Sequence, residues 1–340
     1  MNVLRRLGTL SILSAAVVIV PATEATAQAW VPAKGEGAIA IAVQSTNVQR
    51  HLADTLAVDA GDIDAVVVLG DVTYGLTDKV AIDLAVPVVT SKYRGPLPHP
   101  DTNVDDGTYR STVTDFRMAL RYNITRKGLV LTPYIGSIVP SHGYAFYGHA
   151  APGERLHELQ VGAYAAKLVT SGPLAGLFLS GRAGYGFVEK VEDVSHNRTT
   201  GSFEVGYFLT PSFRAFGMLD GQYTHGGIDF PRTGGMRALP PRYQPVHDII
   251  QRVHNVHAGA GFSYSISDSV DAFASFSRSV AGRNGHALNR GVTVGASWGF
   301  NRSKGSVTAA GAGAPSAEFA RLTGKREGSL GRCICQKSAS

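Results

Sequence analysis

The sequence lacks the long apolar runs that form transmembrane helices, and its one short apolar run lies at the start. Arg5 and Arg6 precede an apolar run over 7–20, and small residues follow at 25–27. This run is too short to span a bilayer, which takes about 20 apolar residues in a helix. A basic start, a short apolar run and a small-x-small site are typical of a secretory signal peptide. We therefore expect residues 1–27 to be an export signal.

Cysteine is nearly absent, since Cys333 and Cys335 are its only two copies and both lie in the last ten residues. Their spacing is too short for a relaxed disulfide, and two thiols without nearby histidines make no metal site. A region 28–300 free of cysteine suits the oxidising periplasm. The segment 301–340, rich in Ala, Gly and Ser at 305–317, is expected to be a disordered periplasmic tail. No cofactor is indicated.

Excess charge and catalytic motifs are also missing. The formal net charge of +6 comes from the ends, because basic and acidic residues are equal in number between positions 28 and 300. We therefore expect no nucleic-acid partner. No hydrolase elbow, phosphate loop or zinc helix motif occurs. Ser141 and His142 are the nearest pairing, but neighbours on a strand point to opposite faces, so we expect no contact between them and no enzymatic activity.

The chain does contain a regular alternation of short and long connections. Short turns lie at 75–78, 125–128, 170–173, 210–212 and 267–269, and longer loops at about 49–63, 89–111, 140–156, 188–200, 226–251 and 281–288. The segments between them are apolar at every second residue. This pattern is typical of a transmembrane β-barrel with short periplasmic turns and long outer loops.

Twelve strands follow from this alternation, and an even number puts both ends of the barrel on the periplasmic side. We predict them at 36–48, 64–74, 79–89, 112–124, 129–139, 157–169, 174–187, 201–209, 213–225, 253–266, 270–280 and 289–300. The predicted fold is all-β: an antiparallel up-and-down transmembrane barrel over 28–300. It would lie in the outer membrane of a Gram-negative bacterium, in contact with its lipids and lipopolysaccharide.

The two faces of the strands differ most clearly on six of them. On 112–124, for example, Met118 and Leu120 oppose Arg117 and Arg121. The apolar faces end near the short turns in aromatic residues, which resemble the girdle of a membrane barrel: Tyr74, Tyr122, Tyr207, Tyr264 and Trp298. A soluble β-sandwich could also alternate, but the charged second face fits a lumen better. The strands 129–139 and 157–169 alternate poorly and have no firm register.

The segments 70–78, 207–211 and 294–300 resemble the outer-membrane transporter family named for the meta-pathway of phenol degradation. The resemblance implies a channel for small aromatic or hydrophobic compounds, and it supplies no site residues. The ending at Trp298, Gly299 and Phe300 also resembles the terminal strand that the barrel-insertion machinery recognises. We therefore expect passive diffusion of such solutes, with a structural or surface-interaction barrel with a closed lumen as the alternative.

Residues whose place in the alternation directs them into the lumen, which we call lumen parity, are candidates for the solute path. They are Arg117, Arg121, Arg182, Phe208, Arg214, Phe216, Met218, Asp220 and Phe273. The charges could pair across strands and fill the interior, or they could form a constriction that selects solutes. The four apolar members could form a patch beside Arg214 and Asp220 that suits an aromatic solute, or they could pack against an inserted segment such as 30–35.

The longest loop, 226–251, is unusually apolar and contains four prolines. We expect it to fold into the outer mouth as a gate, although packing on neighbouring loops or on lipopolysaccharide is an equal alternative. The candidates there are Phe230, Arg232, Arg237 and Tyr243.

Two further sequence patterns could indicate metal sites, and each also has a simpler interpretation. The acidic run 101–107 resembles a calcium loop with its glycine one place late, and a solvated loop is favoured. His247, His254 and His257 are interpreted as surface histidines. No metal is expected.

Overall fold

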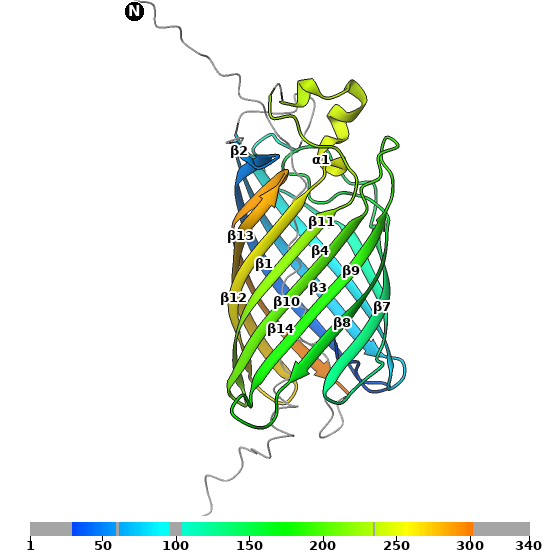
Figure 1. The fold of residues 1–340 in the computed structure, drawn as a ribbon, viewed down its shortest axis with the longest axis vertical. Helices are drawn as coiled ribbons and strands as arrows, with labels where there is room; N and C mark the ends of the chain where they lie inside the picture. The colour runs from blue at the N-terminus through cyan, green and yellow to red at the C-terminus, as the bar shows by residue number, and fades with distance from the viewer. Residues whose placement is uncertain (1–28, 59–60, 96–103, 234, 302–340) are drawn as a thin grey trace, which may run out of the picture.

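The computed structural model describes residues 29–58, 61–95, 104–233 and 235–301, which form a closed antiparallel barrel (Figure 1). Its wall strands are β1 (Gly37–Ala53), β3 (Asp62–Gly75), β4 (Val80–Arg94), β6 (Asp115–Tyr122), β7 (Leu129–Pro140), β8 (Glu158–Leu168), β9 (Leu177–Val188), β10 (Arg198–Thr210), β11 (Phe213–Thr224), β12 (His254–Ser265), β13 (Val270–Arg283) and β14 (Gly285–Phe300). The short β5 (Arg110–Val113) continues β6 along β4, and β2 (Leu56–Val58) folds back on β1. The wall therefore has twelve strands, as predicted.

The barrel closes where its first and last strands pair. The register of β1 with β14 runs from Gly37 opposite Phe300 to Leu52 opposite Gly285, and β1 pairs with β3 on its other side. Closure leaves no strand edge for which lipid could offer no hydrogen-bond partner. Among the described residues, no helix is long and apolar enough to cross a membrane.

The predicted outward and inward faces are confirmed. On β14, Val294 is 50% exposed and Trp298 54%, whereas Thr293 and Ser297, which immediately precede them, are buried in the lumen. The expected girdle is also outward: Tyr74, Tyr122, Tyr207, Tyr264 and Trp298 are all exposed. An exposed apolar belt of this kind is the surface that a barrel presents to lipid.

The two strands without a predicted register carry apolar side chains on both faces. On β7, Val130 and Tyr134 point inward while Leu129 and Ile135 are exposed outside. On β8, Tyr164 is buried inside. Alternation was weak because this part of the lumen is itself apolar.

The outer loops at 49–63 and 281–288 were predicted wrongly. β1 continues as strand to Ala53, and β13 meets β14 at a turn containing Asn284, whose φ is 54°. Asparagine tolerates this left-handed conformation, so the hairpin needs no longer loop. The expected export signal at 1–27 lies outside the described residues, as does the expected tail 301–340 apart from Asn301.

The longest loop lies over the outer mouth (Figure 1). It contains two short 3-10 helices, η1 (Gly235–Ala238) and η2 (Pro241–Val246), and one turn of α-helix, α1 (His247–Ile250). The short turns gather at the opposite end of the barrel. The lumen and its two ends are therefore the places where a solute path would run.

We predict that arginine on the outward face destabilises the barrel according to depth. Val294 lies four residues above Trp298, or about 10 Å along the membrane normal in a tilted strand, which is near the midplane of a band about 25 Å tall. Val294→Arg should cost about 2–4 kcal/mol of unfolding free energy, measured by urea titration in lipid, whereas Leu209→Arg beside a periplasmic turn should cost about 0–1 kcal/mol. Equal losses would contradict this placement of the membrane.

Candidate functional site: the lumen and its two ends

A buried ion pair joins β4 and β6 near the periplasmic end. Arg121 donates from Nε to Asp83 Oδ2 at 2.5 Å and from Nη2 to Asp83 Oδ1 at 2.7 Å, and Thr73 donates to Asp83 Oδ1 at 2.6 Å. The guanidinium of Arg121 is fully buried. Two parallel hydrogen bonds fix both side chains, so Arg121 lines the lumen as part of a neutral pair.

A second buried pair lies among aromatic rings. Arg214 Nη1 is 2.9 Å from Glu204 Oε1, and both side chains are at most 2% exposed. The Arg214 guanidinium carbon lies 5.0 Å from the ring centre of Phe178, 5.8 Å from that of Phe208 and 5.1 Å from that of Phe216. Arginine over ring faces is a favourable contact, stronger where water is excluded. Here the charge is balanced by Glu204, and Arg214 Nε also donates to Ser263 Oγ at 3.3 Å beside the rings.

Arg182 is held by polar side chains on the same part of the wall. It donates to the Tyr134 hydroxyl from Nε at 3.0 Å and from Nη2 at 2.8 Å, and to Gln160 Oε1 at 3.2 Å. Its guanidinium also faces the rings of Tyr134 and Tyr164. Aromatic contact is therefore shared by Arg182 and Arg214.

The described chain begins inside the periplasmic end of the lumen, where Ala29, Trp30 and Val31 are buried. The Ala29 carbonyl accepts from Thr132 Oγ1 at 2.5 Å, and the Trp30 carbonyl accepts from Arg121 Nη1 at 3.2 Å. The Trp30 indole stacks on the ring of Phe178 at 5.9 Å between centres.

These residues share one apolar cluster with several lumen side chains: Ala29, Trp30, Val130, Tyr134, Tyr164, Ala166, Phe178 and Phe208. Phe208 therefore packs on an inserted segment, the alternative raised from the sequence. That segment is 29–31 within the range described, slightly earlier than 30–35.

The other lumen candidates do not form the expected single patch. Phe273 belongs to a different cluster, with Ala42, Leu69 and Ala85. Met218 is buried on β11, and a Cβ on Gly259 of the neighbouring strand would come within 2.4 Å of its Cε. Arg214 pairs with Glu204 rather than with Asp220, which is partly buried on β11, and Arg117 is partly buried on β6.

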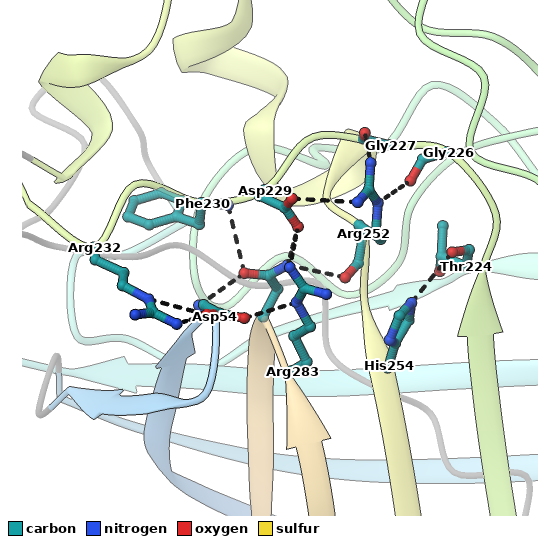
Figure 2. A network of polar contacts seen from close by, with 11 residues as sticks. Asp54, Thr224, Gly226, Gly227, Asp229, Phe230, Arg232, Arg252, His254 and Arg283 are labelled. Atoms are coloured by element: carbon teal, nitrogen blue, oxygen red, sulfur yellow. Dashed lines mark hydrogen bonds and ion pairs between the residues drawn. The ribbon is translucent and has the colours of Figure 1, made fainter.

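At the outer end, an ionic network fastens the longest loop to the hairpin tips (Figure 2). Asp54 accepts from Arg232 Nε at 2.9 Å and forms an ion pair with Arg283, whose Nε is 2.7 Å away. Arg283 also forms an ion pair with Asp229 at 3.3 Å. The hydrogen bond from Arg232, with the charges of Arg232 and Arg283, holds the pKa of Asp54 below its usual value. We call Asp54, Asp229, Arg232 and Arg283 the latch.

Backbone groups of the loop are held beside the latch. The side-chain oxygen of Asn284 accepts from the Asp54 amide at 2.9 Å and from the Phe230 amide at 3.4 Å. Arg252 donates to the Gly226 carbonyl at 2.8 Å and to Asp229 Oδ2 at 3.2 Å (Figure 2). Both ends of the loop are therefore tied to the barrel rim.

The gate candidates lie in different surroundings. Phe230 is buried with Ala53 and Leu239, and Tyr243 packs partly against that cluster. Arg237 is exposed. Helix α1 also inserts toward the barrel, since Ile250 is fully buried. Of the four candidates, Phe230 and Arg232 thus fasten the loop.

Two interpretations of histidine are corrected. His247 and His257 are buried rather than on the surface, because α1 turns inward and His257 has lumen parity. Burial lowers the pKa of His247 to about 4, so this loop histidine is neutral at neutral pH.

The expectation that Ser141 and His142 make no contact is wrong. Ser141 Oγ and His142 Nδ1 are 2.8 Å apart, because both follow the end of β7 and do not alternate as strand residues would. His142 Nε2 also contacts Thr112 Oγ1 at 3.3 Å.

The expectation of a solvated acidic loop holds for only one of its described carboxylates. Asp106 is exposed, and hydrogen bonds from Thr108, together with Arg110, lower its pKa to about 2. Asp105 is instead buried, with the His149 and Ala150 amides each donating to it at 2.9 Å. The positions 101–103 lie outside the described residues.

No family model and no curated protein matches the chain. Among solved structures, an outer-membrane channel from Pseudomonas putida F1 is similar with a TM-score of 0.59 at 12% identity, over 78% of this chain and 96% of that chain. The chain has the fold of an outer-membrane β-barrel. The NanC porin (TM-score 0.42, 8% identity, 76% and 98% covered) and the translocator domain of NalP from Neisseria meningitidis (0.43, 13%, 78% and 88%) are more distant. Closure and the apolar belt place the protein in the bacterial outer membrane.

We predict that Glu204 on β10 and Arg214 on β11 are coupled in their contribution to the stability of the barrel. Removing one partner leaves a buried uncompensated charge, so Arg214→Met should lower the unfolding free energy in lipid by about 3–5 kcal/mol. The double variant with Glu204→Leu should recover part of that loss, because no charge is left behind. Arg242→Ala in the exposed loop serves as the control and should change stability by no more than about 0.5 kcal/mol. Additive losses in the double variant would show that the two side chains are not coupled.

Proposed function

We propose that the protein is an outer-membrane channel through which small hydrophobic or aromatic compounds diffuse passively. The observation that carries this proposal is the surroundings of Arg214. Its charge is balanced by Glu204, and three phenylalanine rings surround the guanidinium. A pore that selects ions needs charges that act on the solute, whereas here Arg214 and Glu204 act on each other.

The position of Trp30 supports an aromatic solute. Its indole lies against Phe178 in the lumen, in a cluster that also contains Tyr134 and Phe208. A small aromatic compound could take the same place by stacking on the same rings, with Arg121 and Arg182 offering donors nearby. The inserted segment would then act as a plug that a solute displaces.

Two likenesses agree with this proposal. The similar structure from Pseudomonas putida F1 is described as an outer-membrane channel. The resemblance of 70–78, 207–211 and 294–300 to the transporter family of the meta-pathway of phenol degradation points to aromatic solutes. A non-enzymatic role is consistent with both.

The alternative is a structural or surface-interaction barrel with a closed lumen. The same plug favours it, because the carbonyls of Ala29 and Trp30 are both hydrogen-bonded to the wall. The channel and the closed barrel differ in the effect of removing the Trp30 side chain. Only in the channel should its removal open a path for a solute.

The chain contains two tryptophans, which provide a matched pair of variants: Trp30 in the lumen and Trp298 on the lipid face. Uptake of the uncharged dye N-phenyl-naphthylamine by intact cells, whose lipopolysaccharide slows its entry, measures the path. We expect wild-type protein to raise uptake above that of cells lacking it, and Trp30→Ala to raise it severalfold further. Trp298→Ala should match wild type at equal levels of folded barrel. Uptake at the background level in all three would support the closed barrel instead.

A separate experiment tests the longest loop as a gate. Asp54→Asn weakens the latch, because it replaces the carboxylate that receives Arg232 and Arg283. We expect greater dye uptake from this variant and from deletion of 235–244, which removes η1 and most of η2. Asp106→Asn, an exposed carboxylate paired within its own loop, is the control. Unchanged uptake through folded latch and deletion variants would rule out a gate.

A further inference from the structure

Three histidines that are far apart in the sequence meet at the outer end of the barrel. His51 on β1 and His286 on β14 are directly opposite each other across the seam that closes the barrel. His149 comes from the loop between β7 and β8. All three are buried, at 0%, 4% and 0% exposure for His51, His286 and His149. The fold thus brings three imidazoles together, two from the strands on either side of the seam and one from a loop.

The spacing of the ring nitrogens is close to that of metal ligands. One nitrogen from each ring can be chosen so that all three lie within 4.8 Å of one another. His286 Nε2 and His51 Nδ1 are 3.0 Å apart. Zinc–nitrogen bonds of 2.0–2.1 Å in a tetrahedron place ligand nitrogens about 3.3 Å apart. Side-chain shifts of about 1 Å would therefore bring all three nitrogens onto one ion.

A carboxylate and an aromatic ring hold His149 in place. Asp105 accepts from the backbone amides of His149 and Ala150 at 2.9 Å, and its Oδ2 lies 3.4 Å from His149 Nδ1. Tyr93 stacks on the other side, with ring centres 4.6 Å apart and planes at 10°. A carboxylate behind an imidazole is the usual support of a metal-bound histidine, since it fixes the ring and raises its basicity.

Packing alone does not account for this choice of residues. Burying polar rings costs free energy that leucine or phenylalanine would not cost, and the surrounding cluster is apolar: Val48, Ile63, Ala65, Tyr93, Val104, Ala150 and Leu288. A neutral imidazole offers one donor and one acceptor, and the contact between His286 Nε2 and His51 Nδ1 uses one of each. A cation bound by the three rings would place positive charge next to Asp105.

We propose that His51, His149 and His286 bind one divalent transition-metal ion of the class of Zn²⁺. Imidazole ligands suit Zn²⁺, Ni²⁺ or Cu²⁺ and do not suit Ca²⁺ or Mg²⁺, which prefer oxygen. Asp105 is the positioning residue. This proposal is independent of the transported solute.

The position of the site indicates what the ion does. His51 lies 14 residues along β1 from Gly37, which is about 35 Å along the normal in a strand tilted by about 40° and so above an apolar belt about 25 Å tall. The ion would join the seam to the two loops that carry Asp105 and His149. Bound metal therefore acts as a staple that holds these loops over the outer mouth.

The test uses the full chain without an affinity tag, with Cys333→Ser and Cys335→Ser to remove the other soft ligands. Metal-free protein is titrated with ZnCl₂ by calorimetry, and bound zinc is counted by mass spectrometry. We expect one equivalent of Zn²⁺ per barrel and none of Ca²⁺. Visible absorption of Co²⁺ bound in place of zinc reports nitrogen ligands directly.

Matched variants separate the site from other histidines. His149→Ala should abolish stoichiometric binding, whereas His142→Ala, an exposed histidine seven positions away in the same loop, should leave it unchanged. Asp105→Asn should weaken Zn²⁺ about 10–100-fold while keeping the stoichiometry, as loss of a supporting carboxylate does. Heat-modifiable migration in gels verifies that each variant is folded.

Hydrogen exchange tests the staple. Zn²⁺ should slow exchange of the backbone amides over 141–157 in the parent protein and not in His149→Ala. Absence of zinc binding by the folded parent, or equal binding by His149→Ala and His142→Ala, would overturn the site. Stoichiometric binding without slower exchange would overturn its role as a staple.

Discussion

The structure depends on the pairing of its first strand with its last. Inside a bilayer, a peptide group without a hydrogen-bond partner costs several kcal/mol, so a sheet can span the membrane only when no edge is left open. The register of β1 with β14 supplies that closure from Gly37 to Leu52. It also places His51 opposite His286, so the same pairing that makes the barrel possible brings together two of the three histidines.

The closed wall also determines what the inward side chains contact. They meet partners on neighbouring strands, and the inserted residues Ala29 and Trp30 pack against one part of the wall. Arg121 is paired with Asp83 and Arg214 with Glu204, whereas Arg182 is held by the Tyr134 hydroxyl and Gln160. Aromatic rings line the interior beside these ion pairs, and Trp30 of the inserted segment packs against them. Two of the inward charges are thus neutralised by partners on the wall itself.

Much of the wall could be predicted from the sequence, because the period of two is imposed by lipid on one face. Val294 and Ser297 differ in exposure as parity required. Parity also placed Arg121, Arg214 and Phe208 in the lumen, but it could not show which charges pair or that Phe208 and Phe273 lie in different clusters. Those outcomes depend on strand tilt and on the inserted segment, which leave no periodic signal.

The outer end was predicted least well, and for a physical reason. Above the membrane, lipid no longer imposes alternation, so β1 and β14 continue as strands where loops were expected, and loop residues fold inward on tertiary contacts alone. His51, His149 and His286 are separated by 98 and 137 positions, and only barrel closure and loop docking join them. His247, His254 and His257 are close in sequence, yet strand geometry and the inward turn of α1 separate their surroundings. For a barrel, therefore, a histidine cluster in the sequence is a weaker indication of a site than histidines at the outer ends of the strands that close it.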